Sequence, residues 1–255
     1  MRRSADKRVK IIINADDLGI SPEVNESIFG LIGGKHVTSA TLIANAPEIY
    51  HAARSIGRFP SCSFGAHLNL SEFAPLSREG ASLLAQGGAM SRELIEQVSP
   101  QPRILHAIFT EFSAQISRLL ALGVPITHLD SHQHIHTLPS VFPALKAVQA
   151  RFCIRKLRNT RNIYLPEHAI SQALSMKKKL YGVALRNLYR STTPDGLTDL
   201  PTLLKLNAQQ ARRFGSLEVM VHPGARGQEA DEATLQTSWM ESLPFASEPS
   251  SYHRL

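Results

Sequence analysis

The sequence predicts an α/β fold built on a parallel sheet or barrel. Short runs of β-branched and apolar residues alternate along the chain with segments of helical periodicity, the order expected when helices connect parallel strands. These runs are apolar at almost every position, as in strands that are covered on both faces. The chain has 255 residues, of which 43% are hydrophobic, so one large core can form. No linker or internal repeat divides the sequence, and we expect a single domain over residues 1–255.

The first predicted strand, residues 9–15, ends at the adjacent carboxylates Asp16 and Asp17. Ser21 can cap the following helix and Pro22 suits its first turn, so a helix is predicted to begin there. The alternation of strand and helix continues to residue 221. Further strands are predicted at 37–44, 62–70, 125–130, 152–157 and 217–221, and further helices after Pro47, over 104–120, after Pro139 and within the basic segment that ends at residue 190.

Two stretches lack a clear periodicity. Residues 71–101 are rich in Ser, Gly and Ala, and we interpret them as a long loop that could form an active-site lid. Residues 241–255 read as a short polar end of the chain.

Positive charge is concentrated in one segment. Residues 151–190 hold ten Lys or Arg and one Glu, which gives +9, whereas the remainder carries −2 of the total charge of +7. Such a segment can bind nucleic acid, anionic lipid or an anionic substrate. No nucleic-acid-binding motif accompanies it, and aromatic residues make up only 6% of the chain. We therefore predict a solvated helical face with at most weak, nonspecific affinity for polyanions.

Cysteine content and hydropathy indicate the cellular compartment of the protein. Cys62 and Cys153 are the only cysteines, which excludes a disulfide framework and favours a reducing environment. No apolar stretch reaches the ~20 residues of a membrane-spanning helix, and the basic N-terminal residues lack the apolar block of a secretory signal. These features predict a cytoplasmic protein without a membrane span.

Acidic and imidazole side chains lie where four predicted strands end. They are the pair Asp16 and Asp17, His67, the cluster at 128–136, and His222. The carboxyl ends of parallel strands meet at one edge of a sheet or barrel, where ligands bind and catalysis occurs. We therefore expect these residues to form one site.

Density and spacing make the cluster at 128–136 a candidate for metal ligation or acid–base chemistry. Its members would share one face of an extended strand, although the strand must end within the run; they are His128, Asp130, His132, His134 and His136. One carboxylate and two imidazoles leave open positions on a divalent ion, as hydrolysis requires. A carboxylate outside the ligand set would serve as general base and a facing histidine as general acid. Asp16 and Asp17 would point to different sides of an extended strand, which suits two separate roles.

With these residues identified, the sequence resembles the YdjC-like (ChbG/HpnK) family of carbohydrate deacetylases. Four ordered motifs together are specific for the family, and the resemblance covers about residues 9–224, leaving 225–255 poorly matched. The matching motifs are INADDLG (13–19), GAHLNL (65–70), THLDSHQHIH (127–136) and LEVMVHPG (217–224), together with VTSAT (37–41).

The resemblance implies a distorted (β/α) barrel of the polysaccharide-deacetylase and glycoside-hydrolase type. It implies that Asp17, His67 and His132 bind one divalent metal ion, Mg²⁺ or Zn²⁺. It further implies that Asp16 is the general base and His222 the general acid, while His134 and His136 support the site or touch substrate. The implied reaction removes an N-acetyl group from an acetylated amino sugar or oligosaccharide. No specific nucleic-acid partner is implied, and a homodimer is left open.

Two other functions compete with the deacetylase hypothesis. A metal-dependent phosphoesterase would use similar Asp and His clusters, but it would more naturally hold two ions, and no Gly-rich phosphate loop is present. A non-catalytic binder of nucleic acid or anionic membrane would use residues 151–190 and show steeply salt-sensitive binding. The complete set of acids and histidines favours an enzyme.

Overall fold

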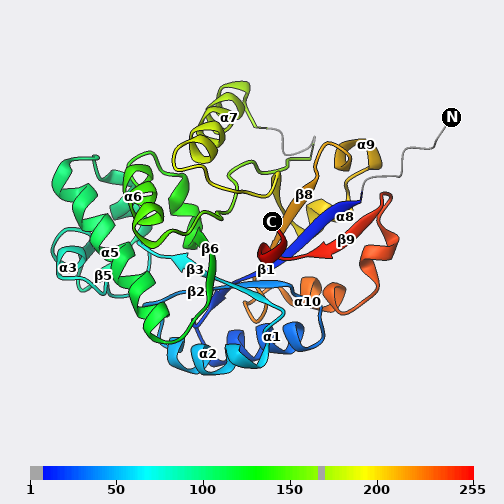
Figure 1. Cartoon of the computed structure of the whole chain (residues 1–255), viewed down its shortest axis with the longest axis horizontal. Coiled ribbons are helices and arrows are strands. Elements are labelled where there is room, and N and C mark those ends of the chain that lie inside the picture. The colour runs from blue at the N-terminus through cyan, green and yellow to red at the C-terminus, as the bar shows by residue number, and fades with distance from the viewer. Residues whose placement is uncertain (1–7, 166–169) are drawn as a thin grey trace.

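The computed structural model describes residues 8–165 and 170–255, and a seven-stranded parallel sheet lies at its centre (Figure 1). The strand order is β6-β3-β2-β1-β8-β7, and β9 also pairs with β1. The predicted α/β class is therefore confirmed. The strands are β1 (Val9–Leu18), β2 (Ser39–Leu42), β3 (Ser63–Leu68), β6 (Ile126–Ser131), β7 (Gly196–Asp199), β8 (Ser216–Val221) and β9 (Ser247–Ser250).

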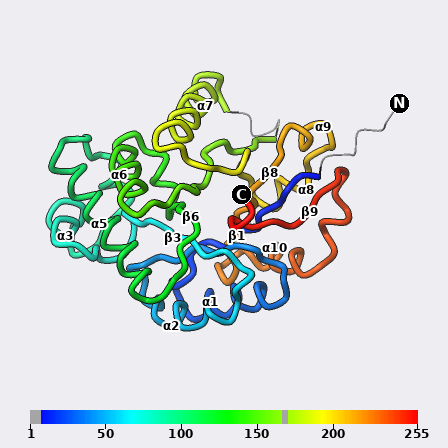
Figure 2. The backbone as a smooth tube through the Cα atoms, viewed as in Figure 1, coloured from blue at the N-terminus to red at the C-terminus, as the bar shows by residue number. Residues whose placement is uncertain are grey.

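Helices surround this sheet and connect its strands, as the ribbon and the backbone trace show (Figures 1 and 2). Ser21 caps the first helix by accepting a hydrogen bond from the backbone N–H of Val24, as the sequence predicts. Among the described residues, no helix combines the length and the hydropathy needed to cross a bilayer. The principal helices are α1 (Pro22–Gly33), α2 (Ile49–Ser55), α5 (Pro102–Ala121), α6 (Phe142–Phe152), α7 (Gln172–Asn187), α8 (Leu200–Leu204), α9 (Ala208–Ala211) and α10 (Glu229–Leu235).

Residues 71–101, interpreted from the sequence as a long loop, contain regular structure. Ser77 and Ser91 each cap a six-residue helix, and a two-stranded hairpin lies between the two helices. Helices this short show too few turns for a periodic pattern to be recognised in the sequence. The elements are α3 (Arg78–Leu83), β4 (Ala85–Gln86), β5 (Ala89–Met90) and α4 (Arg92–Gln97).

The prediction of a strand at 152–157 is wrong, because α6 ends at Phe152 and the next residue, Cys153, caps it in the left-handed conformation (φ 55°). The following backbone makes isolated parallel bridges instead of a strand. Leu157 pairs with β6, and Asn162 pairs with β7. Irregular backbone thus connects the two outer strands of the sheet, which is consistent with a distorted barrel; closure into a barrel stays a prediction.

The C-terminal segment contributes to the sheet, so β8 is not the last strand. Residues of β9 pair in parallel with the first half of β1, from Val9 to Ile12. Tyr252, within the short 3-10 helix η5 (Tyr252–Arg254), is completely buried. The strand β9 is not predicted from the sequence, because Ser-Glu-Pro-Ser lacks the β-branched and aromatic residues that indicate strands.

Alternate residues of β1 face two different environments. Ile11, Ile13 and Ala15 belong to the hydrophobic core. Asn14 and Asp16 have the other parity and are buried among polar side chains. The two-residue period of β1 therefore places the carboxylate of Asp16 on the face with buried polar side chains, while the opposite face packs in the hydrophobic core.

Candidate metal centre and active site

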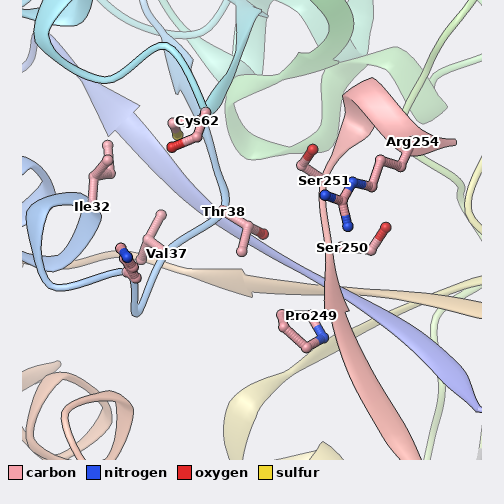
Figure 3. A pocket seen from close by; sticks show the side chains of 10 residues that line it. Ile32, Val37, Thr38, Cys62, Pro249, Ser250, Ser251 and Arg254 are labelled. Atoms are coloured by element: carbon pink, nitrogen blue, oxygen red, sulfur yellow. The ribbon is translucent and has the colours of Figure 1, made fainter.

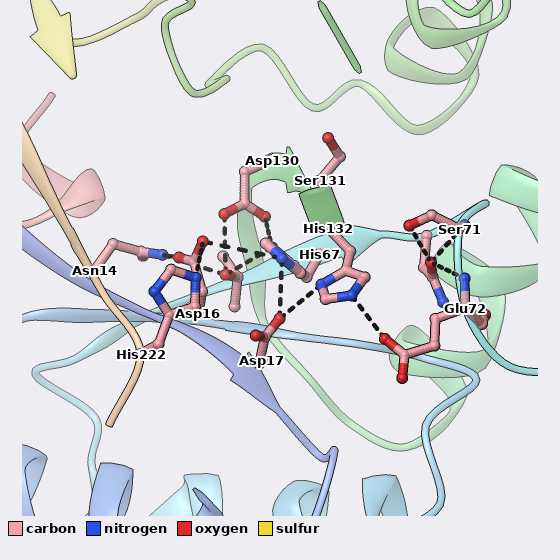
Figure 4. A network of polar contacts seen from close by, with 12 residues as sticks. Asn14, Asp16, Asp17, His67, Ser71, Glu72, Asp130, Ser131, His132 and His222 are labelled. Atoms are coloured by element: carbon pink, nitrogen blue, oxygen red, sulfur yellow. Dashed lines mark hydrogen bonds and ion pairs between the residues drawn. The ribbon is translucent and has the colours of Figure 1, made fainter. Parts of the chain in front are cut away.

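Three side chains from distant parts of the sequence converge at the carboxyl ends of the strands (Figure 4). Asp17 is the penultimate residue of β1, His67 lies on β3, and His132 begins the 3-10 segment η2 (His132–Thr137) after β6. Their ligand atoms all lie within 4.8 Å of one another. Oδ1 of Asp17 is 3.3 Å from Nε2 of His67 and 2.9 Å from Nδ1 of His132. These are the three residues for which the family resemblance implies metal binding.

The backbone of β1 departs from extended geometry at Asp17. Its φ is 68°, and the register with β2 shifts between Ala15 and Leu18. An extended strand would turn the two adjacent carboxylates to different sides. Here Oδ2 of Asp16 and Oδ1 of Asp17 lie 3.9 Å and 3.3 Å from the same atom, Nε2 of His67. Both carboxylates therefore belong to one site.

Each imidazole of this group has a carboxylate on its outer nitrogen. Nδ1 of His67 lies 2.7 Å from Oδ1 of Asp130, and Nε2 of His132 lies 2.9 Å from Oε2 of Glu72. Carboxylates in this position orient a metal-binding imidazole and increase its basicity. The inner nitrogens then face the carboxylate of Asp17, so the donor set fits a single divalent ion with open coordination positions.

The electrostatics of His67 also favour positive charge at this point. Burial lowers the pKa of His67, but the charges of Asp130 and Asp16 and the hydrogen bonds to Asp130 and Asp17 outweigh it and raise the pKa to about 10. For Asp17, burial raises the carboxyl pKa, and hydrogen bonds from His132 and His67 bring it well below its usual value.

The loop that carries Glu72 is held by Asn69 of the GAHLNL motif. Oδ1 of Asn69 accepts hydrogen bonds from the backbone N–H groups of Ser71 and Glu72, and its Nδ2 donates to the carbonyl of Glu72. Glu72 is not among the site residues predicted from the sequence, because it lies in the stretch with no clear periodicity. Its only sequence signal is its place just after a predicted strand.

Asp16 is held by a buried arginine. Arg158 donates to both carboxylate oxygens, with Nη1–Oδ2 at 2.7 Å and Nη2–Oδ1 at 2.6 Å, and Asn14 adds a hydrogen bond of 2.8 Å. Burial raises the pKa of Asp16, but the charge and hydrogen bond of Arg158 and the charge of His67 outweigh this effect. The carboxyl pKa is therefore lowered, and the group is oriented as an anion.

Arg158 joins three carboxylates that come from three strands. Besides Asp16, its guanidinium lies 2.9 Å from Oδ2 of Asp130 and 2.8 Å from Oε1 of Glu218. Tyr252 donates to the other oxygen of Glu218 at 2.6 Å. The prediction that the cations of residues 151–190 form a solvated helical face is wrong for Arg158, which is fully buried.

His222 lies at the mouth of the site, with 33% of its side chain exposed. Its Nε2 is 3.9 Å from Oδ2 of Asp16, so Asp16 lies between His222 and the imidazole of His67. Gly224 closes the turn after His222 with a φ of 78°, and a Cβ there would lie 2.7 Å from the backbone of Val24 on α1. Glycine is therefore required for the turn that positions His222.

The remaining histidines of the 128–136 cluster occupy other environments, because β6 ends at Ser131 and the parity of the strand no longer applies. His128 stacks on Tyr252 with ring centroids 3.6 Å apart. His136 is buried and its Nδ1 contacts the hydroxyl of Ser131. His134 has a φ of 56°, and burial is the main cause that lowers its pKa to about 4.

The cavity in Figure 3, about 380 Å³, is separate from this site. It lies near the amino ends of β2 and β3, beside β9, and none of the site residues named above lines it. A smaller cavity of about 260 Å³ is lined by Asp199 and Met220, at the carboxyl ends of β7 and β8. Met220 precedes His222 by two residues in the sequence, and none of the site residues named above lines this second cavity.

The chain has a parallel α/β fold with one carboxylate and two imidazoles at the carboxyl ends of its strands. These features place it in the class of α/β proteins with a candidate site for one metal ion. Within that class, the family described as YdjC-like protein matches residues 10–254, including the C-terminal strand. The chain belongs to this family.

Curated relatives carry related names. A carbohydrate deacetylase of Halalkalibacterium halodurans is 31% identical over 84% of this chain and 85% of its own length. A chitooligosaccharide deacetylase of Proteus mirabilis is 31% identical over 84% of this chain and 80% of its own. A carbohydrate deacetylase of Geobacillus stearothermophilus is 36% identical over 61% of this chain, and the match spans 62% of that relative, less than two thirds of its length.

One solved structure has the same fold over nearly the whole chain. A protein of Enterococcus faecalis, titled a putative cellobiose-phosphate cleavage protein, aligns with a TM-score of 0.75 over 97% of this chain and 98% of its own. The two sequences are 22% identical, so this likeness supports the fold alone.

Proposed function

We propose that this protein is a metal-dependent hydrolase that removes an N-acetyl group from an acetylated amino sugar or oligosaccharide. The main observation that supports this proposal is that Asp17, His67 and His132 converge, and that a carboxylate contacts the outer nitrogen of each imidazole. Three protein ligands with open positions suit a catalytic metal site better than a closed structural one, which supports the proposal. The names of the curated relatives support a carbohydrate substrate with an acetyl group.

The proposed roles follow from the geometry. A divalent ion, Mg²⁺ or Zn²⁺, at these three residues would supply a more acidic water and a polarised acetyl carbonyl. Asp16 would accept the proton of the attacking water, because Arg158 keeps its carboxylate ionised and oriented. His222, 3.9 Å from Oδ2 of Asp16, would donate a proton to the departing amine.

The sugar would extend from His222 toward the cavity at the ends of β7 and β8. This space is lined by the polar side chains of Asn162, Tyr164 and Asp199, which suit hydroxyl groups, and Tyr164 offers an aromatic ring. The larger cavity of Figure 3 is not a candidate for this role, because none of the proposed metal ligands, nor Asp16 or His222, lines it.

A phosphoesterase with two ions is less well supported. A second group of possible ligands, Asp16, His67 and Asp130, does occur among the described residues. However, the guanidinium of Arg158 lies 2.6 Å from Asp16 and 2.9 Å from Asp130. This fixed positive charge occupies the place that a second cation would need, so the arrangement favours one ion.

The deciding experiment measures acetate release from N-acetylglucosamine oligomers after chelation and the return of single metals. We expect no release after chelation and recovery with one stoichiometric divalent ion. A parallel assay with p-nitrophenyl phosphate tests the alternative. Phosphate release with two bound ions, without acetate release under any metal, would refute the deacetylase assignment.

A further inference from the structure

The outer face of α7 exposes an unusual amount of apolar surface. Nine large hydrophobic side chains are exposed in the described part of the chain, and three of them lie on one face of α7. Met176, Leu180 and Val183 are 57%, 65% and 56% exposed. Their i, i+4, i+7 spacing places them on one side of the helix. Scattered exposed leucines are ordinary in soluble proteins, but a continuous stripe of this kind marks an interaction surface.

The opposite side of α7 is firmly attached to the protein. The ring of Tyr181 packs edge-on against Phe142 of α6, with centroids 5.1 Å apart, and its hydroxyl donates to the carbonyl of His136. Lys146 donates to the carbonyl of Leu185 at 2.6 Å. Figure 2 shows α7 at the edge of the molecule, beyond α6. The exposed stripe is therefore not the unpacked core face of a displaced helix.

Cations accompany the apolar stripe. Lys177, Lys179 and Arg186 are exposed, and α7 contains no acidic residue. Within the residues that the structure describes, none of these three makes an ion pair that would neutralise it. Lys178 differs, since it points back to Asn162 and Tyr164. A helix with an apolar stripe, flanking lysines or arginines and no acids has the composition of a helix that lies in a membrane interface.

We propose that α7 docks this protein onto the surface of a bilayer containing anionic lipids, with Met176, Leu180 and Val183 inserted among the headgroups. Charge complementarity selects this occupant. A second copy of the chain would bring the same uncompensated cations against each other. Nucleic acid would meet the cations but gain nothing from an aliphatic stripe without aromatic rings. Docking of this kind is independent of the proposed deacetylase chemistry.

The test is co-sedimentation of the full chain with vesicles of phosphatidylcholine, with or without phosphatidylglycerol. We expect binding only to the vesicles with phosphatidylglycerol, and weaker binding as salt increases. Leu180→Asp should abolish binding. The double variant Lys179→Gln/Arg186→Gln should weaken it about 25-fold, at about fivefold for each cation. Leu120→Asp is the matched control, because Leu120 is 47% exposed on α5, and it should bind like the parent.

Several outcomes would overturn membrane docking. Equal binding to neutral vesicles would show nonspecific adsorption, and loss of binding in Leu120→Asp would show that the contact is not confined to α7. A dimer that Leu180→Asp dissociates, without vesicle binding by the parent, would assign the stripe to a second copy of the chain. Binding to duplex DNA that survives Leu180→Asp, again without vesicle binding, would assign only the cations a role. The charge variants leave the apolar stripe intact, so the test stands even where Leu180→Asp folds poorly.

Discussion

Replacing each of the two adjacent carboxylates separates metal binding from proton transfer. Asp17→Ala removes the oxygen that lies 3.3 Å from His67 and 2.9 Å from His132. We expect this variant to lose metal and activity together. Asp16→Asn keeps the shape of the side chain and removes the proton acceptor. It should retain metal and slow turnover by ~10²–10⁴, the usual contribution of a positioned general base, which corresponds to about 3–5 kcal/mol.

The structure also predicts a cost in stability for Asp16→Asn. Both oxygens of Asp16 accept hydrogen bonds from Arg158, and an amide would place an N–H against one of these donors. Since Arg158 keeps Asp130 and Glu218 as partners, we expect the free energy of unfolding to fall by about 1–3 kcal/mol. An isolated buried charge would cost more. The melting temperature should fall by about 2–12 °C.

The assay therefore combines three measurements on each variant: bound metal after equilibrium dialysis, acetate release, and thermal unfolding. Glu26→Gln, an exposed acid on α1, is the control and should change none of them. Loss of metal from Asp16→Asn with retention in Asp17→Ala would show that the two roles are reversed. Unchanged turnover in a folded Asp16→Asn enzyme would refute the base assignment.

Three further predictions concern the buried support of the site. Tyr252→Phe removes the 2.6 Å hydrogen bond to Glu218 and should destabilise the fold by about 1–3 kcal/mol in denaturant unfolding; no loss would mean that Glu218 finds another donor. His128 has a pKa lowered to about 3, mainly by burial, so between pH 6.5 and 3 the unfolded chain binds a proton that the folded chain does not. Stability should fall on acidification through that window with a contribution of about 1.4 kcal/mol per pH unit, and His128→Phe should remove this part of the slope; an unchanged slope would contradict the assignment. Gly65→Ala would place a Cβ 2.6 Å from the His128 ring, whose other face is stacked on Tyr252. We therefore expect the free energy of unfolding to fall by about 1–3 kcal/mol. An unchanged free energy of unfolding would show that the ring can move.

The sequence predicted the location of the site better than its internal contacts. Asp17, His67 and His222 could be placed from position alone, because each follows or ends an apolar run that forms a parallel strand. Spacing could not separate His132 from its neighbours. The structure shows why: Gln133 and His134 take positive φ values, and such a turn changes the direction of side chains without any change in residue type.

Other contacts depend on pairings that the sequence does not encode locally. Glu72 reaches His132 across 60 positions, and Tyr252 reaches Glu218 from a polar C-terminal segment. Neither residue lies in a run with a recognisable period. Asn69 holds the loop of Glu72 after β3, and Tyr252 follows β9, whose pairing with β1 arises from tertiary structure rather than from local propensity.

The cations of residues 151–190 show why net charge over a segment is a poor guide to surface potential. Arg158 is enclosed by Asp16, Asp130 and Glu218, so its charge is neutralised inside the protein and does not contribute to attraction at a distance. Lys179 is exposed and retains its effect on an approaching anion. A sum of charges gives the two residues equal weight, although one stabilises the carboxylate proposed as general base and the other faces solvent. The burial of each charged side chain must therefore be known before net charge can predict a binding partner. On α7 the exposed cations indicate a membrane interface because an apolar stripe lies beside them.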